Sequence, residues 1–307
     1  MVELDLGCAV NLEHIFECGQ CFRWNRQDDG SYVGVANGER VRVKQLTINN
    51  AQLTVGEEFR EAKFCNKIII EGSENVEFWT EYFDCGFDYE GVKAEFCGDD
   101  EVLARCAEYG YSIRILRQDL FEVIISFIIS ANNNIPRIKG IVERLCELCG
   151  DGVAFPTAEQ IVGAGLEKLS TIGAGYRDKY IFGAAEMILG VGRDAPGAPP
   201  EKIQWRAEGV TPYKWLDEIS ALSTDEARKE LLRIPGVGPK VADCVLLFGL
   251  RRFDVFPADV WIQRILNEAY GVPSGEIAAF AEERFGEFRG LAQQYLFYYF
   301  RENNIKR

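Results

Sequence analysis

The chain has 307 residues, of which 47% are hydrophobic, so it is long enough for one large domain or two ordinary ones with a sizeable core. No apolar run reaches the ~18 residues of a membrane span, and the acidic N-terminal segment is unlike a signal peptide. We therefore expect an intracellular protein whose ten cysteines are reduced. The net charge of −14 argues against generic nucleic-acid binding through a basic surface.

The negative charge is unevenly distributed. Residues 1–100 hold 9 Lys and Arg against 20 Asp and Glu, whereas the remaining residues hold 25 against 28. Between residues 228 and 264, seven basic residues outnumber four acidic ones. The second part of the chain could thus carry a basic face, although an ordinary acidic cytosolic enzyme is the simpler interpretation of the charge alone.

Residues 20–70 contain short strand-like runs separated by turn signals. Asn37-Gly38, between two alternating runs, is a strong signal for a β-hairpin. This part of the chain predicts an antiparallel sheet with little helix. The expected strands cover residues 22–24, 32–35, 41–43, 53–55 and 68–70.

From about residue 100 the hydrophobic period becomes helical. Asp119 is placed to cap a very apolar, buried helix over 119–131. Gly190 to Pro200 form a Gly/Pro-rich loop. The change of type predicts an α+β protein with an N-terminal antiparallel sheet domain over 1–104 and an all-helical domain over 105–307. Further helices are expected at 136–149, 176–189, 213–221, 224–232, 239–250, 259–270, 276–285 and 291–302.

The most informative stretch is residues 232–244, in which one helix ends, a Pro-Gly-Val-Gly hairpin follows, and another helix begins. The backbone N–H groups of Gly236, Val237 and Gly238 at a helix N-terminus can bind a phosphate without a basic surface. Taken alone, such a hairpin is equally compatible with a purely structural helix turn.

Nineteen residues after Lys240 stands Asp259, which follows Pro257 and precedes an amphipathic run, so it is expected to open a helix. The hairpin, the lysine directly behind it and this aspartate resemble the signature of the helix-hairpin-helix DNA glycosylase superfamily. The resemblance implies that Lys240 and Asp259 are catalytic, because a lysine at this place marks the members that also cleave the DNA strand.

The chemistry requires this pair of residues. A lysine amine can attack the anomeric carbon, displace the damaged base and form a Schiff base that permits β-elimination. Only the neutral amine attacks, so we expect burial or a nearby cation to lower the pKa of Lys240. The Asp259 carboxylate can stabilise the positive charge that develops as the base departs. Cys244 shares the helix face of Lys240, and a thiolate there would raise the lysine pKa, so the ionisation of this pair stays open.

Four further segments resemble the 8-oxoguanine DNA glycosylase family, in the correct order and over nearly the whole chain. They are the Gly-Gln-Cys-Phe-Arg-Trp run at 19–24, the Asn-rich helix connection at 130–138, the Gly-Ala-Gly-Tyr-Arg turn at 173–177 and the Ala-Gln-Gln-Tyr-Leu-Phe run at 292–297. The family removes 8-oxoguanine opposite cytosine from double-stranded DNA, flips the base out of the duplex and needs no cofactor.

The resemblance also implies roles for individual residues. The guanidinium groups of Arg137 and Arg177 would hydrogen-bond the orphaned cytosine. Asn132 and Tyr176 would occupy the space that the flipped base vacates. Cys244 and Phe297 would sandwich the flipped base, and the amide of Gln293 would read its Watson–Crick edge. Without the resemblance, a core aromatic is the preferred interpretation of Phe297, and a capped loop is as good an interpretation of the three asparagines as a functional one.

The resemblance places the backbone carbonyl of Gly19 against N7 of the base. In guanine N7 is an acceptor, whereas in 8-oxoguanine N7–H is a donor, so a fixed carbonyl accepts a hydrogen bond only from the lesion. Glycine suits this place because, lacking Cβ, it lets the backbone approach the base closely. The alternative is that Gly19 only makes a turn before the following strand.

The chain departs from the family pattern at two places, where Trp261 and Phe300 replace a His and an Asp that pair with each other. These replacements put in doubt the binding of a DNA phosphate by the residues at these two positions. The only histidine, His14, lies outside every motif and is expected to be structural. The last cysteine, Cys244, lies within the motif, so the iron–sulfur cluster of related glycosylases is not expected.

Several alternatives remain at this stage. The Cys-x-x-Cys pairs at 18/21 and 146/149 could in principle hold zinc, but the second pair has the spacing of a buried helix face, so no metal is expected. Rival functions are a glycosylase for another damaged base and a non-catalytic DNA-binding protein. We expect the protein to be a monomer. We also expect it in a prokaryotic cytoplasm, associated with the nucleoid, because the sequence shows no basic cluster that could serve as a nuclear localisation signal.

Overall fold

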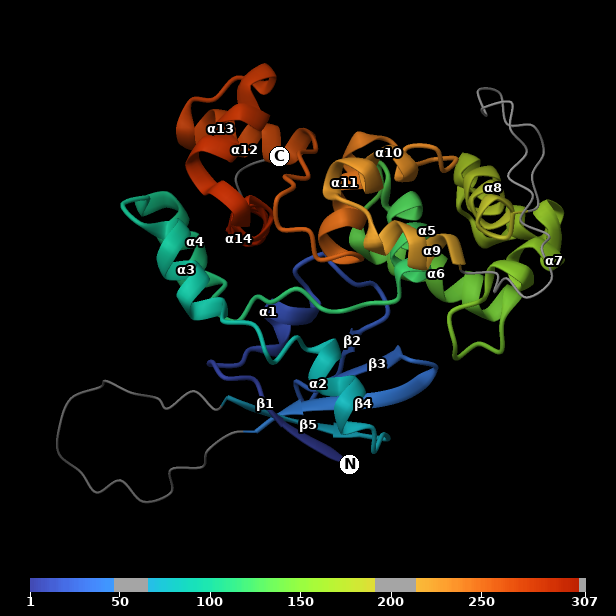
Figure 1. Cartoon of the computed structure of the whole chain (residues 1–307). Helices are drawn as coiled ribbons and strands as arrows, with labels where there is room; N and C mark the ends of the chain where they lie inside the picture. The colour runs from blue at the N-terminus through green and yellow to red at the C-terminus, as the bar shows by residue number, and fades with distance from the viewer. Residues whose placement is uncertain (47–65, 191–213, 304–307) are drawn as a thin grey trace. The chain divides into compact units, whose positions relative to one another are not determined.

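The computed structural model describes residues 1–46, 66–190 and 214–303 and divides the chain into two compact units (Figure 1). The first unit comprises Met1–Arg117 and Val260–Arg307, and the second comprises Gln118–Asp259. The strand predicted at 53–55 and most of the predicted Gly/Pro-rich loop lie outside the described residues.

The first unit contains a five-stranded antiparallel sheet in the order β1-β5-β4-β3-β2, which confirms the predicted sheet. Asn37 and Gly38, with φ angles of 52° and 72°, form the predicted turn between β3 and β4. The strand predicted at 22–24 is displaced to β2. The strands are β1 (Val2–Asp5), β2 (Asn25–Arg26), β3 (Tyr32–Ala36), β4 (Glu39–Gln45) and β5 (Lys67–Glu71).

One face of the sheet is buried, because alternate residues along its strands point into the same hydrophobic core. The helices α1 (Leu12–Phe16) and α2 (Val76–Tyr82) contribute aromatic residues to that core. Trp24 stacks on Phe16 at a ring distance of 4.2 Å and donates its indole N–H to the Tyr82 hydroxyl at 2.8 Å. The core thus anchors the segment that contains the Gly-Gln-Cys-Phe-Arg-Trp run.

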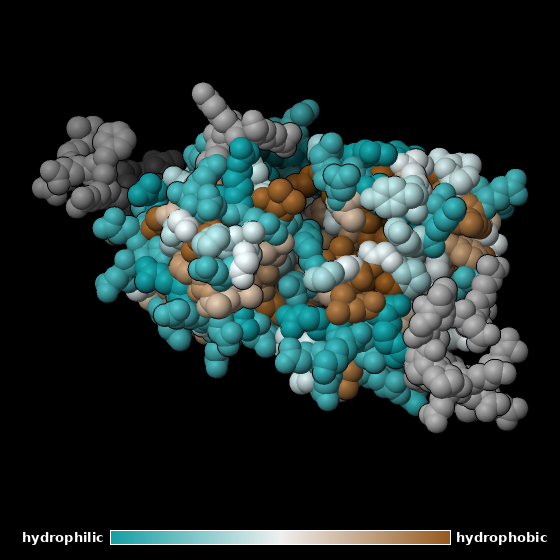
Figure 2. All heavy atoms as spheres, turned by 90° about the horizontal axis from the view of Figure 1, so that it is seen from above, coloured by the Kyte–Doolittle hydropathy of each residue, from teal (hydrophilic) through white to brown (hydrophobic). Residues whose placement is uncertain are grey.

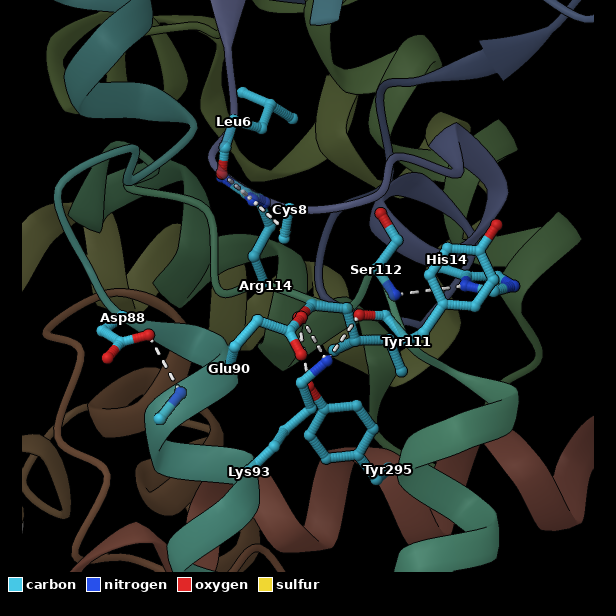
Figure 3. Close-up of polar contacts among 12 residues, drawn as sticks. Leu6, Cys8, His14, Asp88, Glu90, Lys93, Tyr111, Ser112, Arg114 and Tyr295 are labelled. Atoms are coloured by element: carbon cyan, nitrogen blue, oxygen red, sulfur yellow. Dashed lines mark hydrogen bonds and ion pairs between the residues drawn. The ribbon is translucent and has the colours of Figure 1, made fainter. Parts of the chain in front are cut away.

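The segment at residues 110–117, a turn followed by irregular chain, is held to the rest of the first unit mainly by side-chain hydrogen bonds (Figure 3). Lys93 donates to the carbonyl of Tyr111 at 3.0 Å. The fully buried Arg114 donates to the carbonyl of Leu6 at 2.9 Å. The hydroxyl of Ser112 accepts the backbone N–H of Asn11 at 2.8 Å, so most of the segment's polar groups are paired although it has no ladder partner.

The first unit also contains the C-terminal helices, which the predicted boundary near residue 105 assigns to the other domain. The division differs because α14 packs on α4. Tyr295 of α14 is fully buried and donates its hydroxyl to the carbonyl of Ile113 at 3.3 Å. The remaining helices of this unit are α3 (Tyr89–Cys97), α4 (Glu101–Tyr109), α12 (Val260–Tyr270), α13 (Ile277–Phe285) and α14 (Arg289–Glu302).

The second unit is helical, as predicted. The side chain of Asp119 caps α5 by accepting the N–H of Glu122 at 2.8 Å, and the helix that follows is almost wholly buried. Helix α7 was not expected from the sequence. The helices are α5 (Leu120–Ser130), α6 (Ile135–Cys149), α7 (Ala158–Leu169), α8 (Asp178–Ile188), α9 (Lys214–Ala221), α10 (Thr224–Leu231) and α11 (Pro239–Phe248).

The visible surface is mostly hydrophilic, with hydrophobic side chains in separate patches (Figure 2). Among the described residues, no helix is both long enough and apolar enough to cross a membrane.

Candidate functional site

The Pro-Gly-Val-Gly hairpin connects α10 to α11 in the second unit. The N–H of Val237 closes the turn by donating to the carbonyl of Ile234 at 3.0 Å. Gly236 has a φ of +86°, and a Cβ built on it would lie 2.6 Å from the Cβ of Tyr180. Glycine is therefore required here both for the backbone conformation and for the close approach of the tyrosine. Gly238 precedes α11 without a side-chain cap, so the first N–H groups of this helix have no intrahelical acceptor.

Lys240 lies in the first turn of α11, directly behind the hairpin. Its ammonium nitrogen is 5.6 Å from the centre of the Phe127 ring, and its side chain hydrogen-bonds Cys244 one turn later. Cys244 is buried, whereas Asp259 is half-buried and interacts electrostatically with both residues. The structure thus brings together the nucleophile and the carboxylate that the sequence predicts, and it confirms that Lys240 and Cys244 share a helix face.

The pKa of Lys240 differs from the expectation in its direction. Burial lowers the pKa of Lys240, but the Cys244 thiolate and the Asp259 carboxylate oppose that effect, and the net direction is upward. Burial also raises the pKa of Cys244 despite the nearby ammonium group, so the thiol is uncharged at neutral pH. The interaction with Asp259 favours the ammonium form of Lys240. The prediction of a lowered pKa for Lys240 is therefore wrong for the free protein, because no cation lies among the causes and two acidic groups do.

The three asparagines in the connection between α5 and α6 make different contacts. Asn133 donates its side-chain amide to the carbonyl of Ile129 at 3.2 Å, and Asn134 caps α6 by accepting the N–H of Arg137 at 3.0 Å. Asn132 is exposed and has a φ of +50°, an uncommon conformation for a residue other than glycine. Asn134 is also exposed, but its side chain is engaged in the cap, so Asn132 is the exposed asparagine that does not cap the helix.

The two arginines that the sequence assigns to the opposite base lie in different environments. Arg177 is 4% exposed and donates to the carbonyls of Ala131, Asn132 and Ala174. Its guanidinium therefore supports the Asn132 turn in the free protein. Arg137 is exposed at the start of α6, and among the described residues its side chain donates only to the carbonyl of Gly173, at 3.3 Å. Arg137 thus retains donors that face solvent.

A pocket of about 310 Å³ lies beside the hairpin in the second unit. One wall is the edge-on pair Tyr176 and Tyr180, whose ring centres are 5.9 Å apart and whose exposed fractions are 57% and 41%. The guanidinium of Arg177 lies 4.4 Å from the Tyr176 ring. The sequence analysis missed Tyr180, although its spacing of four residues from Tyr176 places both on one helix face. The pocket is lined by Ile128, Ala131, Tyr176, Arg177, Tyr180, Gly236, Val237 and Gly238.

The other three predicted base-pocket residues lie in the first unit. Gln293 of α14 is 5% exposed, and within the described part of the chain its side-chain oxygen is buried without a hydrogen-bond partner. Gly19 has a φ of +88°, and a Cβ built on it would lie 3.1 Å from the edge of the Phe297 ring. The structure therefore places Gly19 and Phe297 side by side, and glycine allows this approach.

Both departures from the family pattern lie in this unit. Phe300 makes an edge contact with Tyr299 at 5.2 Å, and the indole nitrogen of Trp261 is buried without a partner among the described residues. His14 packs edge-on against Tyr111 and Tyr298, which agrees with the structural role expected for it.

Two family models match nearly the whole chain. The model of the 8-oxoguanine DNA glycosylase N-terminal domain matches residues 5–124, and the model of the HhH-GPD superfamily of base excision DNA repair proteins matches residues 125–287. A probable N-glycosylase/DNA lyase of Methanothermobacter thermautotrophicus is 30% identical over 76% of this chain and 76% of its own length. The N-glycosylase/DNA lyase of Saccharomyces cerevisiae is 36% identical over 58% of this chain and 46% of its own length.

A solved structure also resembles the chain. The 8-oxoguanine glycosylase/lyase of Clostridium acetobutylicum, in complex with double-stranded DNA containing cytosine opposite to 8-oxoG, is 35% identical with a TM-score of 0.78. The match covers 96% of this chain and 93% of that one.

Proposed function

Because this chain belongs to the 8-oxoguanine DNA glycosylase family of the HhH-GPD superfamily, whose members here are N-glycosylase/DNA lyases, we propose that it removes 8-oxoguanine opposite cytosine through a Schiff base on Lys240. The observation that carries the proposal is the cluster of Lys240, Cys244 and Asp259 directly behind a phosphate-binding type of hairpin. A half-buried lysine that interacts electrostatically with a carboxylate supports a functional role, because an apolar residue would serve packing alone better.

The reaction begins when the ammonium group of Lys240 loses its proton. The neutral amine attacks the anomeric carbon, a new C–N bond forms, and the bond to the base breaks with its electron pair leaving on the base, which then takes up a proton. Asp259 stabilises the positive charge that develops on the sugar. The sugar ring opens to a Schiff base, loss of a proton from the adjacent carbon expels the 3′ phosphate, and water releases the lysine.

The proposed preference for cytosine rests chiefly on Arg137. Its guanidinium is exposed at the start of α6, and a planar donor fork suits the O2 and N3 acceptors of cytosine. Arg177 acts with it by holding the Asn132 turn, and Tyr176 is exposed beside that turn. Arg137→Ala should therefore reduce the ratio of excision rates opposite cytosine and adenine, and an unchanged ratio would remove Arg137 from the assignment.

The proposed recognition of the lesion uses the residues of the first unit. The carbonyl of Gly19 accepts N7–H, the Phe297 ring stacks on the base, and Gln293 reads the Watson–Crick edge. The buried, unpartnered oxygen of Gln293 supports this role, because a buried polar atom without a partner costs free energy that a ligand can recover. A duplex with 8-oxo-7-deazaguanine, whose C–H is a poorer donor, should bind more weakly than one with 8-oxoguanine.

Covalent trapping tests the proposal. With borohydride and a duplex containing one 8-oxoguanine, the unmodified protein should form a protein–DNA adduct, and Lys240→Gln should lose both the adduct and base release while still binding DNA. Asp259→Asn serves as the comparison: it should bind normally but react more slowly, by the ~2.7–4 kcal/mol typical of one lost electrostatic contact to the transition state. An adduct that persists in Lys240→Gln would exclude this lysine as the nucleophile.

A further inference from the structure

The last helix of the first unit holds the segment at residues 17–19 through two of its side chains. Gln294 of α14 donates its amide to the carbonyl of Cys18 at 2.5 Å. Arg301 donates to the carbonyl of Glu17. The two side chains are seven residues apart, so they lie on one face of α14.

The next carbonyl along this segment, that of Gly19, is different. Within the described residues it accepts no hydrogen bond, although the two carbonyls before it are both engaged by α14. Gly19 is half-buried, and its backbone lies against the edge of Phe297, which projects from α14 between Gln294 and Arg301. One helix therefore determines where this acceptor lies and leaves it available.

Arg301 contacts both parts of this arrangement. Its guanidinium carbon is 5.4 Å from the centre of the Phe297 ring and 5.3 Å from that of Tyr298. Its side chain is 21% exposed, and one guanidinium nitrogen is buried without a hydrogen-bond partner in the described structure. A Cβ built on Gly19 would lie 3.7 Å from that nitrogen. The arginine thus packs against the ring and the peptide at once.

The other side of the segment is held by Gln20. Its amide donates to the carbonyls of Ile15 at 2.9 Å and Arg114 at 2.8 Å, and its oxygen accepts the N–H of Leu116 at 2.9 Å. Gly19 is consequently held between a residue buried in the first unit and two side chains of α14. An acceptor held in this way cannot turn to accommodate a base that presents an acceptor of its own.

We propose that Gln294 and Arg301 are positioning residues for lesion recognition, which set the Gly19 carbonyl and the Phe297 ring for an oxidised purine that presents N7–H. The inference rests on the proposed function and adds the residues that make its discrimination possible. Neither residue touches the reacting atoms. Their removal should therefore affect excision of the base far more than the chemistry at a site that has already lost its base.

The experiment compares two reactions of the full-length protein. Single-turnover release of 8-oxoguanine opposite cytosine requires the base pocket, whereas strand cleavage at a preformed abasic site does not. Arg301→Ala and Gln294→Ala should each slow base release about tenfold, the factor expected for one lost hydrogen bond of this kind, and leave abasic-site cleavage within about twofold. Arg301→Lys, which keeps a donor and a charge, should restore part of the loss.

The matched control is Arg289→Ala. Arg289 lies on the same helix and also donates to a backbone carbonyl, that of Gly286 at 2.9 Å, but it is remote from the segment at 17–19 in sequence and contacts. It should leave both rates unchanged. Equal losses of both reactions in Arg301→Ala would reveal a general effect on the fold and overturn the inference, as would unchanged base release.

The wild-type protein separates this inference from the proposed function. If it cleaves abasic sites but does not release 8-oxoguanine, the proposed substrate is wrong and the positioning role is rejected with it. If it releases 8-oxoguanine and the variants do so at the same rate, the proposed function stands and only the positioning role is rejected.

Discussion

At the scale of single residues, the site depends on a lysine whose surroundings favour its charged form. Lys240 hydrogen-bonds Cys244 and interacts with the Asp259 carboxylate, and its pKa is raised even though burial alone would lower it. The free protein therefore holds the proposed nucleophile as an ammonium group. Since only the amine attacks, the rate of the lyase reaction should rise with pH over the neutral and alkaline range.

Cys244→Ser tests this electrostatic coupling. The hydroxyl can still form a hydrogen bond but does not ionise in the accessible pH range, so the contribution of the thiolate to the lysine pKa is lost. The rising limb of the pH–rate profile at a preformed abasic site should therefore move to lower pH. A limb that stays in place or moves to higher pH would contradict the coupling.

His14 provides a second pH-dependent property, that of stability. Burial lowers its pKa to about 4 from the ordinary 6.5, so between these values the unfolded state binds a proton that the folded state does not. The free energy of unfolding should therefore fall as the pH falls from about 6.5 and level off below about 4, with a total contribution of ~3 kcal/mol. Denaturant unfolding of the wild type and of His14→Gln, measured from pH 7 to 4, should converge by about that amount; parallel curves would contradict the prediction.

At the scale of elements, the hairpin between α10 and α11 depends on two glycines that differ in what they require. Gly236 has a φ of +86° and no room for a Cβ beside Tyr180, whereas Gly238 has a φ of −95° and open space where its Cβ would be. The conformation of the hairpin therefore depends on the first glycine, while the second leaves open space that the proposed function assigns to the DNA backbone.

Alanine at each position separates these roles. Gly236→Ala should lower the melting temperature by several degrees, because the left-handed conformation costs ~1–2 kcal/mol before the contact with Tyr180 is counted. Gly238→Ala should leave the melting temperature nearly unchanged but weaken binding to duplex DNA. Thermal unfolding and fluorescence anisotropy measure the two effects. Equal losses of stability would show that the hairpin does not distinguish the two positions.

At the scale of the whole molecule, a protein with a net charge of −14 has to bind DNA, which is itself strongly negative. The second unit carries 16 Lys and Arg against 20 Asp and Glu, whereas the rest of the chain carries 18 against 28. The hairpin and most of the predicted DNA-contacting residues thus lie in the unit with the smaller negative charge. In the proposed function, neutral backbone N–H groups of the hairpin supply part of the phosphate binding, which reduces the number of cations that the site needs.

The salt dependence of binding measures this balance. A protein that neutralises Z phosphates with Lys and Arg has a slope of log K against log salt of about −0.9Z, and only a few basic residues border this site. We expect a slope no steeper than about −4 for an 8-oxoguanine duplex, and Arg137→Ala should make it shallower by about one unit. A slope near −8 would indicate a broad basic surface instead.

The sequence by itself determined the features that depend on neighbours along the chain. The cap at Asp119, the Asn37-Gly38 turn and the helix that follows Asp259 are local patterns of hydrogen bonding and hydrophobic period, and each is confirmed. The same holds for the juxtaposition of Lys240 and Cys244, which the helical repeat dictates. The sequence did not reveal α2, α3 and α7, and α7 is interrupted by Gly165, whose φ of +82° is not helical.

The tertiary structure decided what depends on residues far apart in the chain. The assignment of α14 to the first unit follows from burial of Tyr295 against residues near 110–113, and no local pattern encodes that contact. The use of Arg177 to support the Asn132 turn follows from carbonyl groups 45 and 46 positions away. The raised pKa of Lys240 likewise needs Asp259 in space, because burial and charge are summed over three-dimensional neighbours.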